Sequence, residues 1–256
     1  MRTSKPLDRE ELHILKTDRV LEVGSGHNPC YRSNVLVDRY VTNNSHRCGD
    51  LKIYQHQKFI EANGEDLPFK DKEFDYVICN QVLEHVDNPY KFVSELARVA
   101  KRGYIETPSL LGEHLFPKDS HKWVILDIDD KLVLFEKDKM PGNYRNNYGR
   151  LFLDYLPFKS LAYKLLWITD GDLMLNRYEW KDSIDIIVNP TDDYYRSFFI
   201  QPWTIEIGVK LFPQKGTIYE VRTLFCAILR ILKYELKRKM FKGHRMLNIE
   251  EYNSIF

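Results

Sequence analysis

The sequence predicts an α/β protein built on a doubly wound, mostly parallel sheet, with a C-terminal elaboration made of a β-hairpin and helices. Two observations support this class. Short β-branched runs without polar alternation recur in the first half, which is typical of strands buried on both faces of a parallel sheet. A helical pattern follows the third run, so strands alternate with helical connections. With 256 residues and 43% hydrophobic content, the chain can bury such a sheet in one domain.

Three of these runs define the first expected strands. They are residues 19–24 ("RVLEVG"), 35–38 ("VLVD") and 74–80 ("FDYVICN"). Each is short and rich in valine, isoleucine or leucine, as buried central strands are. We therefore expect them to lie side by side in the parallel sheet.

A helix and a fourth strand should follow. Residues 88–101 ("NPYKFVSELARVAK") place apolar side chains at helical spacing, with Pro89 where a first helical turn tolerates proline. We expect Gly103 to stop this helix and residues 103–107 ("GYIET") to begin the next strand.

The second half has a different pattern. Residues 122–137 predict a hairpin around an Asp129-Asp130 turn, and residues 178–188 predict a further strand. Residues 150–168 read as helical apart from Pro157, and residues 222–245 as one basic helix. Without a linker rich in Gly, Ser or Pro, we expect one domain, 1–256. Its parts are a ligand-binding core (14–110), an acceptor-side elaboration (111–215) and a basic C-terminal helix (216–256).

Composition excludes several classes of protein. The net charge of +1 gives the whole molecule no electrostatic case for binding nucleic acid. The four cysteines are scattered along the chain, at Cys30, Cys48, Cys79 and Cys226. They form no C-x-x-C pair, which argues against a zinc cage or a disulfide framework. The chain also lacks a signal-peptide pattern and an apolar run of about 18 residues, so we expect a cytoplasmic protein.

Acidic residues and glycines follow the first two strands. Glu22, Gly24, Ser25 and Gly26 end the first, and Asp38 ends the second. In an open parallel sheet, ligands bind at the carboxyl ends of the strands where strand order reverses. Glycines let a ligand approach the backbone, and a carboxylate there can accept both ribose hydroxyls. This pattern predicts an adenosine-containing ligand.

The turn between these strands discriminates among adenosine ligands. The third glycine of a dinucleotide fingerprint is missing, and only eight residues separate Gly26 from Val35. That is too short for a crossover helix, so a pyrophosphate would lack its helix dipole. A phosphate-free, positively charged ligand that tolerates nearby acids fits better. S-adenosylmethionine is such a ligand, and an NAD-dependent oxidoreductase is disfavoured.

Four ordered motifs carry a family resemblance. "VLEVGSG", "VLVDRY", "NGEDLPFKDKEFDYVICNQVLEHVDNP" and "GYIETPS" resemble the class I S-adenosylmethionine-dependent methyltransferases with a "DLPF…FD…V…LEH" signature. The similarity covers residues 18–110 and implies a Rossmann-like fold. It also implies the residues that contact the cofactor. They are Glu22, Gly24, Ser25 and Gly26 near methionine and ribose, Asp38 on the ribose diol, Asn63, Gly64 and Glu65 around adenine, and Asn80 and Gln81 near the transferred methyl.

Histidines are the candidate catalysts. If the acceptor is an alcohol, a general base within hydrogen-bond reach assists an in-line displacement, and histidine suits neutral pH. His121, in the segment after the strand ending "ETPS", is the first candidate, and His85 is the second. The alternative for each is a packed residue, and for residues 106–123 an ordinary loop whose Trp123 begins a hairpin strand.

The sequence does not predict a metal site. "QVLEHV" resembles an E-x-x-E-H arrangement that holds a divalent ion in some relatives, but Gln81 replaces its first acid. Glu84 and His85 then remain as natural ligands, and two ligands rarely suffice. A helper would have to come from Glu113, His114 or His121.

The C-terminal segment is basic. Between Val221 and Arg245, eight basic side chains face one acid, Glu235. Such a helix can lie on an anionic membrane, here the inner face of the cell membrane, or can pack on the domain with a solvated basic face. Both alternatives stay open on the sequence.

The acceptor is the least determined feature. The succession Glu-Thr-Pro-Ser, His-Lys-Trp and hairpin weakly resembles uncharacterised methyltransferases of bacterial surface-polysaccharide clusters. It implies a sugar hydroxyl on a glycan or lipid-linked precursor. The alternatives are a small-molecule or quinone-type C- or N-methyltransferase and a non-catalytic cofactor-binding subunit.

Overall fold

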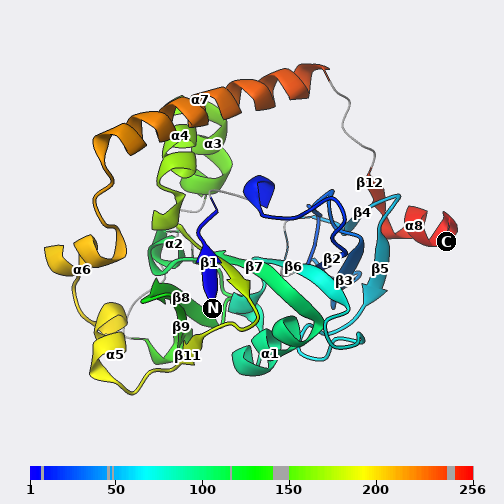
Figure 1. The fold of residues 1–256 in the computed structure, drawn as a ribbon, viewed down its shortest axis with the longest axis horizontal. Coiled ribbons are helices and arrows are strands. Elements are labelled where there is room, and N and C mark those ends of the chain that lie inside the picture. Colours follow the sequence, from blue (N-terminus) through cyan, green and yellow to red (C-terminus); the bar gives the residue numbers. More distant parts are fainter. Residues whose placement is uncertain are drawn as a thin grey trace.

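A seven-stranded sheet forms the centre of the computed structural model, in the order β1-β10-β7-β6-β2-β3-β5 (Figure 1). The structure describes residues 1–6, 9–44, 47, 49–115, 117–140, 150–240 and 246–255. The strands from β7 to β5 are parallel. At the other edge, β10 pairs antiparallel with β7, and β1 pairs antiparallel with β10. The predicted mostly parallel α/β sheet is confirmed. Its strands are β1 (Arg2–Ser4), β2 (Val20–Val23), β3 (Val35–Asp38), β5 (Lys58–Glu61), β6 (Phe74–Asn80), β7 (Ala100–Pro108) and β10 (Leu175–Lys181).

Smaller elements surround this sheet. A three-stranded sheet contains β8 (Trp123–Ile128), β9 (Lys131–Glu136) and β11 (Ile186–Val188), and a two-stranded sheet contains β4 (Lys52–Tyr54) and β12 (Met246–Asn248). The α-helices are α1 (Pro89–Val99), α2 (Leu110–Leu115), α3 (Leu156–Lys159), α4 (Leu161–Thr169), α5 (Asp193–Ile200), α6 (Ile205–Leu211), α7 (Thr217–Met240) and α8 (Ile249–Ile255). Short 3₁₀ turns lie at Arg9–Glu11, Leu83–His85, Lys137–Lys139 and Gly171–Leu173, and a π-helical turn at Arg150–Tyr155.

The main core lies between the central sheet and α1. Phe92 and Leu96 of α1 pack in one cluster with Leu21 and Val23 of β2 and with Ile125 of β8. These side chains are buried because the strands are apolar on both faces and α1 is apolar along one side. The hairpin sheet therefore shares its core with the parallel sheet.

The opposite face is covered without a crossover helix between β2 and β3. Residues 24–34 form only turns and bends, as the short spacing predicts. Leu12 and Ile14, which precede β2, pack instead on Val20, Tyr76 and neighbouring side chains of this face. The segment before the first central strand thus covers a surface that a helix covers in longer α/β units.

Gly103 does not end α1, contrary to the expectation from sequence. The helix ends at Val99, and Ala100 is already extended because it pairs with Phe74 of β6. Gly103 lies inside β7, where a Cβ atom would come within 2.5 Å of the Val77 carbonyl oxygen. The strand is set by pairing with β6, and the glycine is required by close packing within the sheet.

The predicted hairpin is confirmed, but the strand expected over residues 178–188 is two strands. β8 and β9 pair antiparallel around Asp129 and Asp130, whose positive φ values of 52° and 59° suit a tight hairpin turn. β10 joins the central sheet, whereas β11 pairs with β9 of the smaller sheet. Residues 182–185 connect the two sheets, a change of partner that a run of apolar residues does not reveal.

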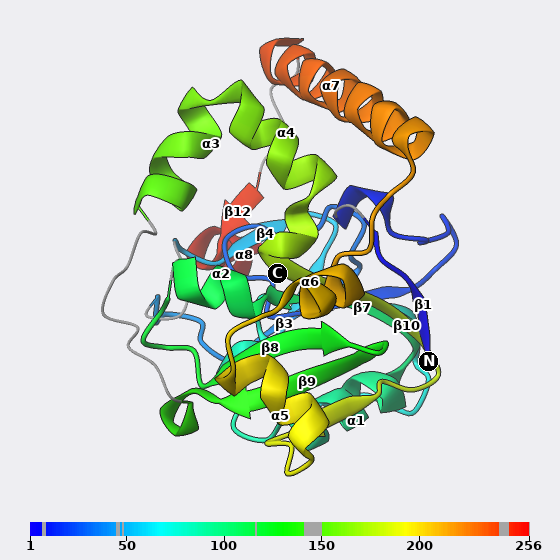
Figure 2. The same ribbon diagram turned by 90° about the vertical axis from the view of Figure 1, so that its left-hand side faces the viewer.

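The C-terminal region is not a single helix, which corrects the expectation for residues 216–256. α7 ends at Met240, and β12 then pairs with β4 while Leu247 and Tyr252 enter a small core. Residues 241–245, including Lys242 and Arg245, lie outside the described residues. In Figures 1 and 2, α7 lies with α3 and α4 away from the central sheet.

Candidate functional site

A cavity of about 280 Å³ opens at the carboxyl ends of the central strands. β2 lies between β3 and β6, so the chain order reverses at this point, where open α/β sheets bind ligands. The ten residues that the sequence assigns to a cofactor all line this cavity, although they come from separate segments. They are Glu22, Gly24, Ser25, Gly26, Asp38, Asn63, Gly64, Glu65, Asn80 and Gln81.

The glycines of the first turn have different physical roles. Both have positive φ, +72° at Gly24 and +52° at Gly26. A Cβ atom on Gly24 would lie 2.2 Å from a methyl carbon of Val82, so packing requires that glycine. A Cβ atom on Gly26 would meet only the Arg47 side chain, at 3.8 Å, which leaves its backbone approachable. Ser25 between them has a buried Oγ with no hydrogen-bond partner among the described residues.

Glu22 shapes the turn rather than offering its carboxylate to a ligand. One oxygen accepts hydrogen bonds from the Cys30 amide at 2.8 Å and the Ser33 hydroxyl at 2.9 Å. The other lies 3.4 Å from the guanidinium of Arg9. Burial raises the pKa of Glu22, and Arg9 opposes that rise. The carboxylate of Glu22 is therefore compensated within the protein.

The loop after β5 is held by its own polar side chains. Glu65 accepts hydrogen bonds from the backbone amides of Asp87 and Asn88, at 2.8 and 3.1 Å. Asn63 Oδ1 accepts one from the Glu65 amide at 3.1 Å. A Cβ atom on Gly64 would lie 2.4 Å from the Phe92 ring. These residues fix the wall of the cavity, and their side chains are largely occupied within the protein.

Asp38 is the carboxylate that faces the cavity. Its Oδ2 accepts a hydrogen bond from the Gly26 amide at 3.3 Å, and its Oδ1 accepts one from the Tyr40 amide at 3.0 Å. The Arg47 guanidinium lies 3.7 Å away and is held by the Val41 carbonyl. Each carboxylate oxygen keeps acceptor capacity, so Asp38 is oriented as binding two neighbouring hydroxyls requires.

The opposite end of the cavity carries a strained backbone. Gln81 has a positive φ of 59°, which is uncommon for a residue other than glycine, and its amide donates to the Glu106 carbonyl at 2.8 Å. The neighbouring Asn80 has a buried Oδ1 without a hydrogen-bond partner among the described residues. Strain and unsatisfied polar atoms concentrate at functional sites, so this end suits the reacting part of a ligand.

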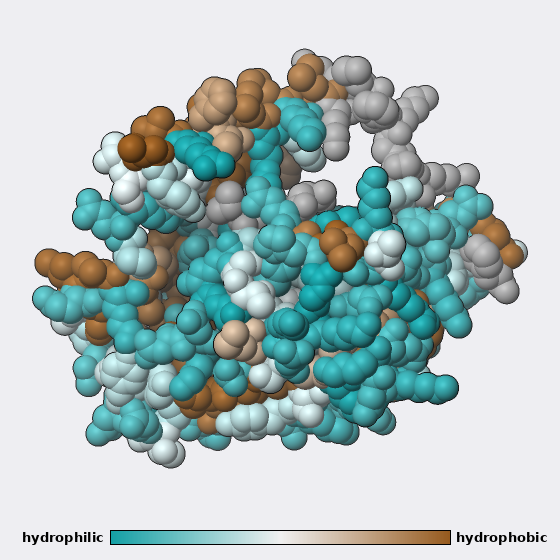
Figure 3. All heavy atoms as spheres, viewed as in Figure 1, coloured by the Kyte–Doolittle hydropathy of each residue, from teal (hydrophilic) through white to brown (hydrophobic). Residues whose placement is uncertain are grey.

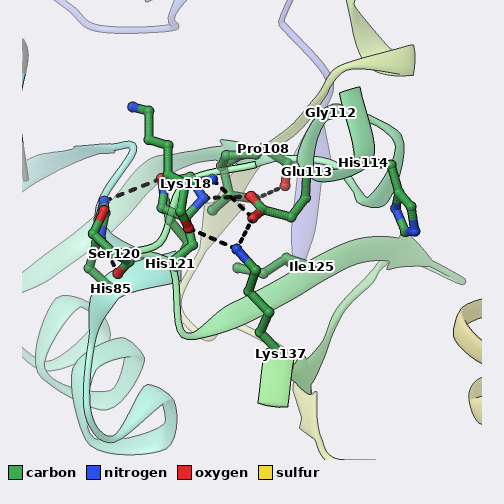
Figure 4. A network of polar contacts seen from close by, with 12 residues as sticks. His85, Pro108, Gly112, Glu113, His114, Lys118, Ser120, His121, Ile125 and Lys137 are labelled. Atoms are coloured by element: carbon green, nitrogen blue, oxygen red, sulfur yellow. Dashed lines mark hydrogen bonds and ion pairs between the residues drawn. The ribbon is translucent and has the colours of Figure 1, made fainter. Parts of the chain in front are cut away.

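The two candidate catalytic histidines lie in different environments. His85 lines the cavity, with its Nδ1 2.9 Å from the Ser120 carbonyl oxygen. His121 is only 4% exposed and lies behind His85, outside the cavity lining, with its Nδ1 2.5 Å from Glu113 (Figure 4). The sequence could not rank them because their burial depends on how the loop before β8 folds back on the Leu83–His85 turn.

Glu84 lies beside both of these histidines. It is 1% exposed, and burial raises its pKa to about 8 despite the nearby Lys118. The ring of His85 packs edge to face on that of His121, with centroids 4.7 Å apart. His114 is not part of this group, since its Nδ1 bonds to the Leu110 carbonyl and its ring points away in Figure 4.

Basic residues of the cavity were missed by the sequence analysis. Arg47 and Lys118 come from loops, and Arg9 comes from the segment before the first central strand. An isolated basic residue in a loop shows no sequence pattern that would place it at the cavity. Only Arg39 could have been placed there, because it directly follows Asp38. The basic residues that line the cavity are Arg9, Arg39, Arg47 and Lys118.

Comparisons with known proteins agree with the motifs. Residues 33–105 match the family described as a methyltransferase domain. An uncharacterized protein of Methanocaldococcus jannaschii is 50% identical over 62 residues, which are 22% of this chain and 30% of that protein. The ubiquinone/menaquinone biosynthesis C-methyltransferase UbiE of Rickettsia typhi is 42% identical over 52 residues, 20% of this chain and 21% of that enzyme. The matches thus span less than a third of these relatives' lengths.

A solved structure gives a match of lower identity over a larger share of the chain. A crystal structure of an S-adenosylmethionine-dependent methyltransferase from Methanosarcina mazei aligns at 19% identity and a TM-score of 0.30. The alignment covers 40% of this chain and 57% of that one.

Proposed function

Because residues 33–105 carry the methyltransferase domain of a family that uses S-adenosylmethionine, we propose that this protein methylates a hydroxyl of a sugar in a glycan or lipid-linked precursor. The observation that carries the methyl-transfer part is the cavity at the strand ends, lined by all ten predicted cofactor residues. It has the oriented carboxylate of Asp38 on one side and the strained Gln81 on the other.

The residues present fit this cofactor. Asp38 would accept the two ribose hydroxyls, because both of its oxygens are held by backbone amides and face the cavity. Ser25 Oγ and Asn80 Oδ1 are buried atoms for which the described protein supplies no partner, so each can bond a polar group of the ligand. The bound cofactor would supply a methyl group activated by a sulfonium.

His85 marks the acceptor end of the cavity. An in-line displacement needs the acceptor oxygen aligned behind the methyl group, and an alcohol has a pKa far above neutrality. A residue that accepts the hydroxyl proton, or makes that proton easier to remove, therefore speeds the methyl transfer. His85 is the described histidine that lines the cavity near Asn80 and Gln81, while His27 lines it beside the glycine turn.

Replacing His85 with alanine should lower turnover by about 100-fold, the lower end of what a proton-handling group contributes. Affinity for S-adenosylhomocysteine should change less than about twofold, because Asp38 and the glycine turn are untouched. Steady-state kinetics and calorimetry measure the two quantities. His114→Ala is the matched control and should leave both unchanged. Equal losses of turnover and affinity would instead make His85 a structural residue.

A long helix gives support for a lipid-linked acceptor. α7 exposes an apolar stripe that recurs at three- and four-residue spacing. Ala227 is the buried residue among the side chains of α7 that the structure describes. It lies about half a turn around the helix from this stripe, so the stripe faces away from the domain. Figure 3 shows apolar side chains gathered along α7 at the top of the view. The stripe consists of Ile218, Val221, Phe225, Ile228, Leu232 and Leu236.

Arg222 and Lys233 flank the stripe, and the sequence beyond them is rich in lysine and arginine. We infer that α7 lies on the surface of an anionic membrane, with its apolar stripe among the acyl chains and its cations at the headgroups. Such contact would bring the cavity to a lipid-linked sugar. No helix among the described residues is both long and apolar enough to span a bilayer.

The full chain should sediment with vesicles containing about one third anionic phospholipid and stay in solution with neutral vesicles, because each surface cation contributes about 1 kcal/mol. A Phe225→Glu, Leu232→Glu double variant should bind the anionic vesicles at least about tenfold more weakly, since both changes would place a charge among the acyl chains. Tyr234→Glu makes the same kind of change about half a turn away and should bind like the wild type. Absence of sedimentation at low salt would rule out the membrane contact.

A second acceptor class has its own support. The match to UbiE, named as a quinone C-methyltransferase, favours an apolar quinone-type acceptor, for which an exposed apolar helix is equally suitable. Incubation with S-adenosylmethionine and either lipid-linked glycans or quinols separates the two, with S-adenosylhomocysteine release and product mass as readouts. Methylated sugar supports the proposal, and methylated quinol replaces it. Cofactor binding without release in either set would indicate a non-catalytic binding subunit.

A further inference from the structure

A buried carboxyl group lies directly behind the wall of the cavity. Glu84 is 1% exposed, and neither of its oxygens has a hydrogen-bond partner among the described residues. Leaving such a group unsatisfied is costly, so native proteins pair nearly all of them or use them to hold an ion. Among the described residues, no donor forms a hydrogen bond with the Glu84 carboxyl oxygens, but two nitrogen atoms lie slightly beyond hydrogen-bond distance.

Those two atoms belong to histidines that approach the same carboxylate oxygen. His85 Nε2 lies 3.9 Å and His121 Nε2 lies 4.0 Å from Glu84 Oε1. The three ligand atoms are all within 4.8 Å of one another, and His121 Nε2 is itself buried without a hydrogen-bond partner. Both separations from Glu84 Oε1 are too long for hydrogen bonds, yet the two histidines approach the same oxygen atom.

The contacts of the second ring nitrogens fix the tautomers. His85 Nδ1 lies 2.9 Å from the Ser120 carbonyl oxygen, which can only accept, so Nδ1 carries the proton. His121 Nδ1 lies 2.5 Å from Glu113, whose other oxygen is 2.6 Å from the ammonium of Lys137 (Figure 4). Glu113 is therefore an ionised acceptor. In each neutral imidazole, the lone pair then lies on Nε2, facing Glu84.

We propose that Glu84, His85 and His121 bind a divalent transition-metal ion of the Zn²⁺ class. Two imidazoles and a carboxylate are a ligand set that zinc uses when one coordination position stays open. Metal-binding histidines usually donate their second ring N–H to a carboxylate or a backbone carbonyl. Glu113 takes this place for His121, and the Ser120 carbonyl takes it for His85. Mg²⁺ and Ca²⁺ fit poorly because they prefer oxygen ligands.

The distances are compatible with a small closure around an ion. Bonds of about 2.0 Å in a tetrahedral site put ligand atoms about 3.3 Å apart, so the two nitrogen–oxygen separations would each shorten by roughly 0.6 Å. The ligand atoms of the two histidines, which lie within 4.8 Å of each other, would have to reach the same spacing, so small shifts of the rings would accompany a rotation of the Glu84 carboxyl group. His85 lines the cavity while Glu84 and His121 lie behind it, so the ion would sit at the cavity wall.

The role of the ion rests on the proposed function, whereas its binding does not. At this place the ion would bind the acceptor hydroxyl and lower its pKa, so that His85 acts as a ligand and not as a free base. The hydroxyl proton would leave to solvent as the oxygen forms its bond to the methyl carbon. The bond between that carbon and the sulfonium sulfur would break, and its electron pair would leave with the thioether S-adenosylhomocysteine. Segment 106–123 thus contributes His121 as the third ligand, one of three candidates among which the sequence could not choose. It also contributes Glu113, which holds His121.

The test is a titration of the untagged, chelator-stripped full chain with Co²⁺, whose visible absorption reports the coordination geometry. We expect one equivalent to bind with the strong bands of a four- or five-coordinate ion, and Zn²⁺ to displace it and to raise the melting temperature. Glu84→Gln and His121→Ala should abolish the bands. Glu113→Gln should weaken binding by about 10- to 100-fold, as loss of an outer partner does.

His114→Ala is the matched control, since His114 lies in the same segment and outside the cluster, and it should bind Co²⁺ like the wild type. Weak octahedral bands only, no Zn²⁺-dependent stabilisation of the wild type, or unchanged binding by His121→Ala would each overturn the proposal. The wild-type titration requires no variant to fold. Calorimetry with S-adenosylhomocysteine runs beside it. Cofactor binding without Co²⁺ binding rejects only the metal site, and the reverse rejects only the proposed function.

Discussion

Replacing Asp38 with alanine should weaken S-adenosylhomocysteine binding by about 100-fold or more. A carboxylate that accepts from both ribose hydroxyls makes two charge-assisted hydrogen bonds, each worth about 1.5 to 3 kcal/mol. Their combined loss, about 3 kcal/mol at the low end, corresponds to roughly two decades in affinity. Isothermal titration calorimetry of the wild type and the variant measures it.

The neighbouring strand offers a matched control for this variant. Glu61 ends β5 directly beside Asp38 in the parallel register, but it is exposed and does not line the cavity. Glu61→Ala removes the same charge at nearly the same place and should leave the affinity unchanged. A wild-type affinity that survives Asp38→Ala would mean that the ribose, or the whole cofactor, binds elsewhere.

Replacing Gly103 with alanine should destabilise the protein by about 3 kcal/mol, the upper part of the usual range for overpacking. The new Cβ atom would lie 2.5 Å from the Val77 carbonyl oxygen and 2.9 Å from the Trp180 ring. Val77 and Trp180 are the partners of Gly103 in the two adjacent strands, so neither can move without disturbing the sheet. The melting temperature should fall by about 6 to 12 °C.

Gly208→Ala provides the comparison for that result. Gly208 lies in α6, and a Cβ atom there would have no neighbour within 4 Å. Alanine favours a helix by about 1 kcal/mol over glycine, so this variant should be slightly more stable than the wild type. Equal melting temperatures for Gly103→Ala and the wild type would show that β7 can shift away from β6 and β10 at little cost.

The central strands could be predicted because their signal is local. β3 and β6 have the predicted bounds, since apolar runs without alternation can be stable only when buried on both faces. The hairpin turn at Asp129 and Asp130 is equally local, because these residue types adopt positive φ readily. The end of α1 was mistaken because a strand pairing, and not a helix-stop residue, determines it.

The pairing partners of the short strands could not be predicted without knowing the fold. β1, β4, β5 and β12 contain three or four residues each, too few for a periodic pattern. β12 pairs with β4 across most of the chain. Such pairing depends on which edges remain open after the central sheet has formed, and no local pattern records that.

By itself, the sequence determined where the central strands end, and therefore which residues lie around the cavity, because strand ends follow from local apolar patterning. Only the tertiary structure decided what each site residue does there. It turned the carboxylate of Glu22 toward Cys30 and Ser33 and left that of Asp38 facing the cavity. It also joined His121 to Glu84 and His85. Burial and charge compensation arise between segments distant in the chain, and spacing along a sequence does not encode them.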